Sequence, residues 1–141
     1  MSATQLTTLA RTSDPHAVLR RLLALDAVVT GVNGIAYLAA AGPLGDFLGT
    51  GTRLLLALGA FLTVYAAAVG LLAARARPAA LPVRAVVEAN LAWAVLSLAA
   101  LGLWLSPTTA GTVWTVLQAL TVAGFAALQY GALRLRQGSS E

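Results

Sequence analysis

A stripe of polar side chains runs through one apolar stretch at spacings of four, three and four residues: Asp26, Thr30, Asn33 and Tyr37. At about 100° per residue they fall within roughly 60° of one face of a helix. Polar and ionisable groups are costly in lipid, so this face must be directed at protein or water. The stripe predicts either a polar seam that hydrogen-bonds neighbouring helices or a site for a ligand or an ion.

A later stretch carries Glu88 and Asn90, which point about 200° apart around a helix, so one face cannot use both. Glu88 falls near the expected depth of Arg84 and Arg134, and we expect an ion pair that anchors the helix. The alternative is a carboxylate that binds a proton or a substrate. Asn90 shares its face with Ser97 and is a further candidate contact for a ligand or an ion.

Two glutamines, Gln118 and Gln129, share one face of the last apolar stretch. Glutamine amides hydrogen-bond across helices, so packing is their default role and contact with a ligand or an ion is the alternative. Trp104, Trp114 and Tyr130 lie near the expected membrane boundaries, where Trp and Tyr are enriched. We therefore expect these three rings to anchor the helices and give them no chemical role.

Small residues line one face of the second apolar stretch: Gly59, Thr63, Ala66, Gly70 and Ala74. Small side chains at this spacing let two helix backbones approach closely. The partner helix belongs either to the same chain or to a second copy. Four short helices enclose little volume, so we expect a homo-oligomer.

The elements that position these residues are four helices long enough to cross a membrane. Of the 141 residues, 59% are hydrophobic and 10% are charged, against about 25% charged residues in soluble domains. A span needs about 20 apolar residues, and four segments qualify: Leu22–Ala41, Leu54–Ala74, Val83–Leu105 and Gly111–Leu133. The chain is therefore predicted to be one all-α domain, a polytopic bundle of four transmembrane helices.

Breakers and end signals divide the chain further. Gly42-Pro43 and Ser106-Pro107 interrupt the apolar pattern, and Ser13-Asp14-Pro15 is a good helix start. Residues 1–12 and 137–141 have no strong pattern, so we expect flexible ends.

Arginine placement predicts the orientation in the membrane. Eight arginines lie on one side of the four spans: Arg11, Arg20, Arg21, Arg75, Arg77, Arg84, Arg134 and Arg136. Only Arg53 lies on the other side. Because basic residues gather on the cytoplasmic side, both termini are predicted to be cytoplasmic. The use of arginine alone as the basic residue, with abundant Ala, Leu, Gly and Val, indicates a high-GC bacterial genome and a bacterial inner membrane.

Several classes of function find no support in the sequence. There is no cysteine, and His16 is the single histidine, so neither a thiol nucleophile nor a His/Cys metal centre is expected. Nucleotide-binding, zinc-protease and serine-hydrolase motifs do not occur. The net charge of +4 comes from arginines at the ends of apolar segments, which favours anionic lipid headgroups over nucleic acid. No residue is assigned a catalytic or metal-binding role, and no cofactor is identified.

Small multidrug transporters also have four short spans and a membrane glutamate, but their weak charge bias differs from the eight-to-one bias here. No acid lies near the middle of the first span either. The chain more closely resembles the uncharacterised four-span membrane proteins of high-GC actinobacteria. This resemblance covers about Arg20 to Arg136, rests on plan and composition, and implies the fold without an activity.

The sequence favours a non-enzymatic bundle whose interior polar residues bind a small molecule or an ion, or set helix packing and self-association. The expected partners are the lipid bilayer, a second copy, and a small lipophilic ligand or ion. The first alternative is a small proton-coupled transporter or exporter that uses Glu88 or Asp26. The second is a membrane-embedded enzyme that acts on a lipophilic substrate.

Overall fold

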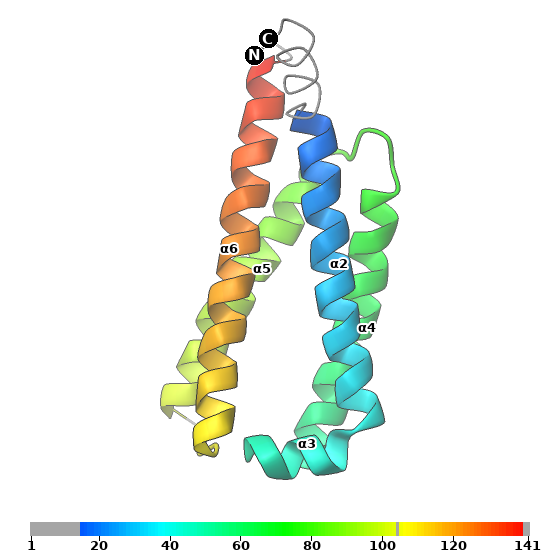
Figure 1. Ribbon diagram of the computed structural model, residues 1–141. Helices are drawn as coiled ribbons and strands as arrows, with labels where there is room; N and C mark the ends of the chain where they lie inside the picture. The colour runs from blue at the N-terminus through cyan, green and yellow to red at the C-terminus, as the bar shows by residue number, and fades with distance from the viewer. Residues whose placement is uncertain (1–14, 104, 140–141) are drawn as a thin grey trace, which may run out of the picture.

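A computed structural model describes residues 15–103 and 105–139, and this part of the chain is a helical bundle (Figure 1). Its helices are α2 (Pro15–Ala39), α3 (Ala41–Leu48), α4 (Thr52–Ala73), α5 (Ala80–Leu103) and α6 (Thr109–Ser139). All but α3 are long and apolar enough to cross a membrane. The four-span, all-α prediction is therefore confirmed, and the protein is a small integral membrane protein.

The ends of the first and last helices can be compared with their predicted positions. The first helix begins at Pro15, where the Ser13-Asp14-Pro15 signal had placed a start. The last helix continues to Ser139, so Gln137 and Gly138 are helical where a flexible end was predicted. Residues 1–12 lie outside the described part of the chain.

The largest difference is α3, which occupies a segment that the Gly42-Pro43 breaker had marked as a loop. Proline is tolerated near the start of a helix because the first N–H groups have no intrahelical acceptor. The helix ends at Gly49, whose φ of 73° is left-handed and whose N–H donates to the Gly45 carbonyl at 2.8 Å. A Gly-Pro pair can therefore occupy the first turn of a short helix, although it would interrupt a helix at an interior position.

The four long helices form two hairpins, α2 with α4 and α5 with α6 (Figure 1). Helices α2 and α6 join the hairpins, whereas α4 and α5 make few contacts. The hairpins lie close together where α2 begins and α6 ends, and they separate toward α3 (Figure 1). The bundle thus has a narrow end and a wide end.

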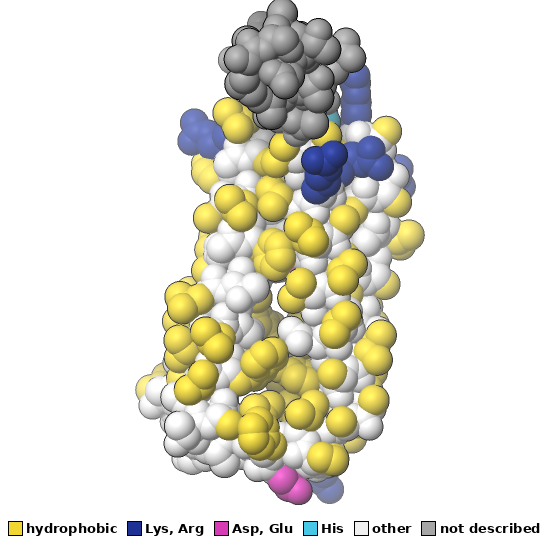
Figure 2. All heavy atoms as spheres, in the orientation of Figure 1, with side chains coloured by type: hydrophobic (Ala, Val, Ile, Leu, Met, Phe, Trp, Pro, Cys, Tyr) yellow, Lys and Arg dark blue, Asp and Glu magenta, His cyan; other side chains and the backbone are white. Residues whose placement is uncertain are grey.

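Arginines gather at the narrow end, which we call the arginine end, and apolar side chains cover the face beyond them (Figure 2). Just inside this end lies a core drawn from α2, α4, α5 and α6: Leu19, Leu23, Val69, Ala73, Val83, Val86, Ala132 and Leu133. Arg20 Nε donates to the Ala73 carbonyl at 3.2 Å, and the Arg136 guanidinium donates to the Pro78 carbonyl. We call this region the closed half of the bundle.

Helices α2 and α4 meet at a pair of glycines. A Cβ on Gly59 would lie 2.9 Å from the Gly34 carbonyl oxygen and 3.0 Å from the Leu38 nitrogen. A Cβ on Gly34 would lie 2.8 Å from the backbone nitrogen of Thr63. The two backbones can approach this closely because neither glycine has a side chain.

The other small residues of α4 also face α2, and the distance between the two helices increases from Gly59 toward Gly70. The Ala66 Cβ would lie 3.4 Å from a Cβ on Gly31, and a Cβ on Gly70 would lie 3.8 Å from the Ala27 Cβ. Ala74 is exposed at the end of α4. The partner of this small-residue face is therefore α2 of the same chain, and the face gives no support to the predicted homo-oligomer.

Candidate functional site

Asp26 is at the centre of a buried set of hydrogen bonds. Its carboxyl group is 2% exposed. Thr30 Oγ1 donates to Oδ1 at 3.1 Å, while Asn90 Nδ2 and Gln129 Nε2 each donate to Oδ2 at 2.8 Å. Asp26 and Thr30 come from α2, Asn90 from α5 and Gln129 from α6, so one carboxyl group connects three of the four spans.

Tyr65 brings the fourth span, α4, into the same set. Its hydroxyl donates toward Asn90 Oδ1 at 3.1 Å and lies 3.4 Å from the Val86 carbonyl. Asn90 Nδ2 also lies 3.1 Å from Gln129 Oε1. A bilayer offers no hydrogen bonds, so polar groups at this depth must satisfy one another. We call Asp26, Thr30, Tyr65, Asn90 and Gln129 the polar network.

A cavity of about 730 Å³ opens between the hairpins on the side of the network that faces α3. Leu48 of α3 lines it at one end, and Asp26, Tyr65 and Asn90 line it at the other. The face drawn in Figure 2 is hollowed between α6 and α2 in this half of the bundle, which we call the open half. The cavity walls are mostly apolar, with a few polar groups among them.

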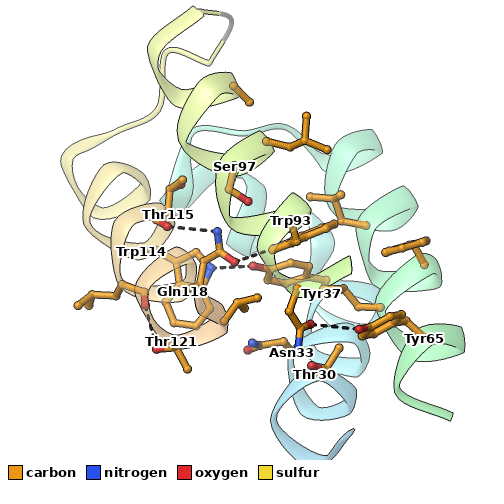
Figure 3. Close-up of a pocket in the computed structure, with 18 of the residues that line it drawn as sticks. Thr30, Asn33, Tyr37, Tyr65, Trp93, Ser97, Trp114, Thr115, Gln118 and Thr121 are labelled. Atoms are coloured by element: carbon orange, nitrogen blue, oxygen red, sulfur yellow. Dashed lines mark hydrogen bonds between the residues drawn. The ribbon is translucent and has the colours of Figure 1, made fainter. Parts of the chain in front are cut away.

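Two hydrogen-bonded pairs of side chains stand on the cavity walls (Figure 3). Trp93 Nε1 on α5 donates to Gln118 Oε1 on α6 at 2.8 Å, and Gln118 Nε2 donates to the Thr115 carbonyl at 3.1 Å. Across the space, Trp114 Nε1 on α6 donates to the Tyr37 hydroxyl on α2 at 2.6 Å. These bonds hold large rings in fixed positions around the cavity.

Three other polar side chains on the cavity wall form no side-chain hydrogen bond within the described residues: Asn33, Thr50 and Ser97. The Thr50 hydroxyl is buried, and no acceptor or donor reaches it within residues 15–103 and 105–139. In the same part of the chain, no hydrogen bond is formed by the half-buried amide of Asn33. Figure 3 shows Asn33 beside Thr30 and Tyr37, on the α2 wall. The half-buried side chains of Asn33 and Ser97 can meet a molecule inside the cavity, whereas the Thr50 hydroxyl has almost no accessible surface.

Helix α3 closes the wide end by bonding to the turn between α5 and α6. Thr108 N donates to the Leu48 carbonyl at 3.2 Å, and Thr108 Oγ1 donates to the Phe47 carbonyl at 2.6 Å. A side chain on Gly111 would overlap the Leu48 carbonyl, so glycine permits this contact. The unpredicted helix thus tethers one hairpin to the other at the end where they separate.

Glu88 lies outside this arrangement. It is exposed on α5, beside a shallow surface groove that Arg84 and Tyr130 also line. In the described residues no arginine nitrogen lies within 4.0 Å of its carboxylate, so the predicted ion pair does not form. Arg134 instead points at Tyr130, with its guanidinium 5.8 Å from the ring centroid and Nη1 3.3 Å from the hydroxyl. Arg134 and Tyr130 are four residues apart on α6, so the two side chains lie next to each other on one face of the same helix.

The structure thus brings together seven of the eight predicted candidates. Asp26, Thr30, Asn90 and Gln129 form the network, and the cavity walls hold Asn33, Tyr37 and Gln118. Sequence reasoning did not single out Tyr65 or Trp93, and it gave Trp114 only the role of an anchor at the membrane boundary. The only signal was the polar atom that each large ring carries and that must find a partner when buried.

The described residues contain no cluster of His, Cys, Asp or Glu that would suit a metal ion. Comparison with protein-family models, curated proteins and solved structures finds no match to this chain. The case for a function therefore rests on the cavity and its surroundings.

Proposed function

We propose that this protein binds an amphiphilic small molecule inside the membrane, in the cavity of the open half. The observation that carries the proposal is the cavity itself, about 730 Å³ of space walled by apolar side chains. Ligand pockets commonly measure about 300–1,000 Å³ and combine apolar walls with a few polar groups that fix orientation. A scaffold whose interior only set helix packing would have no need of such a space.

The unbonded polar groups suit the polar part of such a ligand. The amide of Asn33 offers both a donor and an acceptor, and the Ser97 hydroxyl does the same. A buried polar group without a partner costs about 1–3 kcal/mol, which a ligand hydrogen bond would recover. The apolar part of the ligand would lie against leucine and aromatic side chains on the remaining walls.

The ligand is expected to enter sideways from the lipid. Leu54, Phe61 and Leu96 line the cavity and are 37%, 54% and 63% exposed, so they form a rim between α4 and α5. Val29 and Leu117, 39% and 54% exposed, form a second rim between α2 and α6. Both rims face the region that lipid tails would occupy, where amphiphilic molecules concentrate.

The arginine end supports an orientation with both termini in the cytoplasm of a bacterial inner membrane. The cavity would then lie in the outer half of the bilayer. A reporter enzyme fused after Glu141 should be active in the cytoplasm, and activity on the outer side would reverse the orientation. The binding unit needs one copy of the chain, because all four spans contribute to one cavity.

The binding proposal is tested with triphenylphosphine oxide, a neutral amphiphile whose oxygen accepts hydrogen bonds. Protein in phosphatidylcholine nanodiscs should release binding heat beyond that of empty nanodiscs. Ser97 and Ala100 both line the cavity, so the double variant Ser97→Phe/Ala100→Phe should fill it and abolish this heat. Leu98→Phe, on the exposed side of α5, is the matched control and should bind normally. Equal binding by the filled variant would contradict the proposal.

Export of the bound molecule is a second candidate, favoured by the asymmetry of the bundle. The cavity is blocked toward the arginine end by the core around Leu19, Leu23 and Val83, all 0% exposed. A carrier that alternates access holds one side closed in each end state. Proteoliposomes with an imposed pH gradient should then move tetraphenylphosphonium across the membrane, whereas a protein that only binds should not.

A further inference from the structure

We infer that the preferred ligand of this cavity is a lipophilic organic cation, with Asp26 as its counter-charge. This inference rests on the proposed binding function and names the chemical class of the ligand. It comes from the charges, the hydrogen bonds and the ring faces around the cavity.

The charge that lines the cavity is of one sign. Asp26 is the one acidic residue among the described residues on its walls, and no arginine or histidine in that part of the chain lines it. The arginines of the arginine end stand at the far side of the closed half, and Arg53, at the start of α4, does not line the cavity. In a region of low dielectric, a single carboxylate attracts a cation far more strongly than it does in water and repels an anion.

The hydrogen bonds around Asp26 leave its charge without a cationic partner. Its three donors are a hydroxyl and two amides, and no basic nitrogen lies within 4.0 Å in the described residues. A carboxylate offers about four lone-pair positions. Oδ2 accepts two of these hydrogen bonds and Oδ1 accepts one, and none of the three donors carries a charge that would neutralise the carboxylate. A buried charge that is hydrogen-bonded but unpaired gains stability when a counter-ion arrives.

Stacked aromatic rings lead from the network toward the α4–α5 rim. Tyr65, bonded to Asn90, stacks on Phe61 with centroids 6.0 Å apart and planes at 18°. Phe61 in turn stacks on Trp93 of α5 at 5.8 Å and 6°. Ring faces attract cations, and most strongly where water is excluded. All three rings line the cavity, so a cation entering from the lipid would pass ring faces before reaching the carboxylate.

The same features argue against other charged ligands. A small inorganic cation such as Mg²⁺ or Ca²⁺ needs several oxygen ligands in a compact shell. Here the walls offer one carboxylate among rings and aliphatic side chains, and its oxygens are mostly occupied. An anion would meet no basic group. A cation with its charge spread over a large apolar body fits both the volume and the lining.

Two probes of similar shape separate charge from lipophilicity: the cation tetraphenylphosphonium and the neutral triphenylphosphine oxide. Calorimetry in phosphatidylcholine nanodiscs, with empty nanodiscs subtracted, should give at least about tenfold tighter binding of the cation. Asp26→Asn should remove this preference and keep binding of the neutral probe. Glu88→Gln, which removes an exposed carboxylate from the same protein, should keep the preference.

A second variant covers the case in which Asp26→Asn does not fold. Phe61→Leu removes a half-exposed ring and keeps an apolar side chain on the wall, so it should weaken binding of the cation about 2–5-fold more than binding of the neutral probe. Equal affinities of the native protein for both probes would overturn the inference while binding itself stands. So would a cation preference that survives Asp26→Asn, or one that Phe61→Leu leaves unchanged. Failure of both probes to bind would overturn the proposed function.

Discussion

The closed and open halves of the bundle consist of the same four helices, yet one is filled and the other encloses about 730 Å³. In the closed half, leucine and valine from all four helices fill the centre, and Leu19, Leu23 and Val83 have no exposed surface. In the open half, α3 lies between the separated hairpins, and α4 and α5 touch mainly through the Phe61–Trp93 ring pair. Packing without voids stabilises a helix bundle, so we expect most of the stability to come from the closed half.

The polar network lies at the boundary between the two halves. On one side its members contact the closed core, and on the other Asp26, Tyr65 and Asn90 face the cavity. The comparison teaches that polar residues in a small membrane bundle can hold helices together and line a cavity at once. For Asp26 the sequence left a polar seam and a ligand site as alternatives, and the structure places it in a seam that borders the cavity.

The largest expected effect is the loss of a core leucine in the closed half. Leu23→Ala should lower the free energy of unfolding by about 2–5 kcal/mol, because it leaves a void that the packed helices cannot fill. Leu96→Ala, in the open half at 63% exposure, should change it by less than about 0.5 kcal/mol. Denaturant titration in one detergent measures both. Similar losses at the two positions would show that the halves do not differ in packing.

A smaller effect is expected from crowding the contact between α2 and α4. Gly59→Leu should destabilise the protein by about 1–3 kcal/mol, because its Cβ alone would lie 2.9 Å from the Gly34 carbonyl oxygen. Gly124→Leu is the matched control, since nothing lies within 4 Å of a Cβ there. Thermal unfolding of both variants makes the comparison. A stable Gly59→Leu protein would mean that α2 and α4 do not pack as closely as described.

Breaking the network should cost less than either. Gln129→Leu removes the bonds to Asp26 and Asn90, and hydrogen bonds between membrane helices contribute about 0.6 kcal/mol on average, with a maximum near 1.7 kcal/mol. Gln118→Leu removes one bond between helices, to Trp93, and one within α6, to the Thr115 carbonyl, on a wall that faces the cavity. The first variant should lower the unfolding temperature more than the second. A larger drop for Gln118→Leu than for Gln129→Leu would show that the Trp93–Gln118 pair stabilises the bundle more than the polar network does.

The smallest effect is expected at Glu88. Glu88→Gln should leave the unfolding temperature unchanged within error, because the side chain is exposed and holds no arginine within 4.0 Å in the described chain. Circular dichroism in detergent measures it. A clear drop in unfolding temperature would contradict this and would support the anchoring ion pair that the sequence predicted. Glu88 would then stabilise the bundle, as the Asp26 network does.

Much of this protein can be read from its sequence. Four apolar stretches of sufficient length, separated by Gly and Pro, determine four spans because a bilayer accepts only helices of about that length. The spacing of Asp26, Thr30, Asn33 and Tyr37 determines that they share a face, and the cost of polar groups in lipid turns that face inward. Likewise, Gly59 and Ala66 mark a surface for close packing, because small residues at that spacing have few other uses.

Only the tertiary structure decided how these faces meet. The rotation of one helix against another fixes whether Tyr65 faces lipid or Asn90, and periodicity along a single helix carries no information about it. The same holds for Glu88, because the sequence does not show that Arg134 contacts Tyr130 and not the Glu88 carboxylate. At the wide end of the cavity, α3 is bonded to Thr108, a contact between residues 61 positions apart that no local pattern encodes. Local spacing sets which residues share a surface, while packing across helices sets what that surface touches.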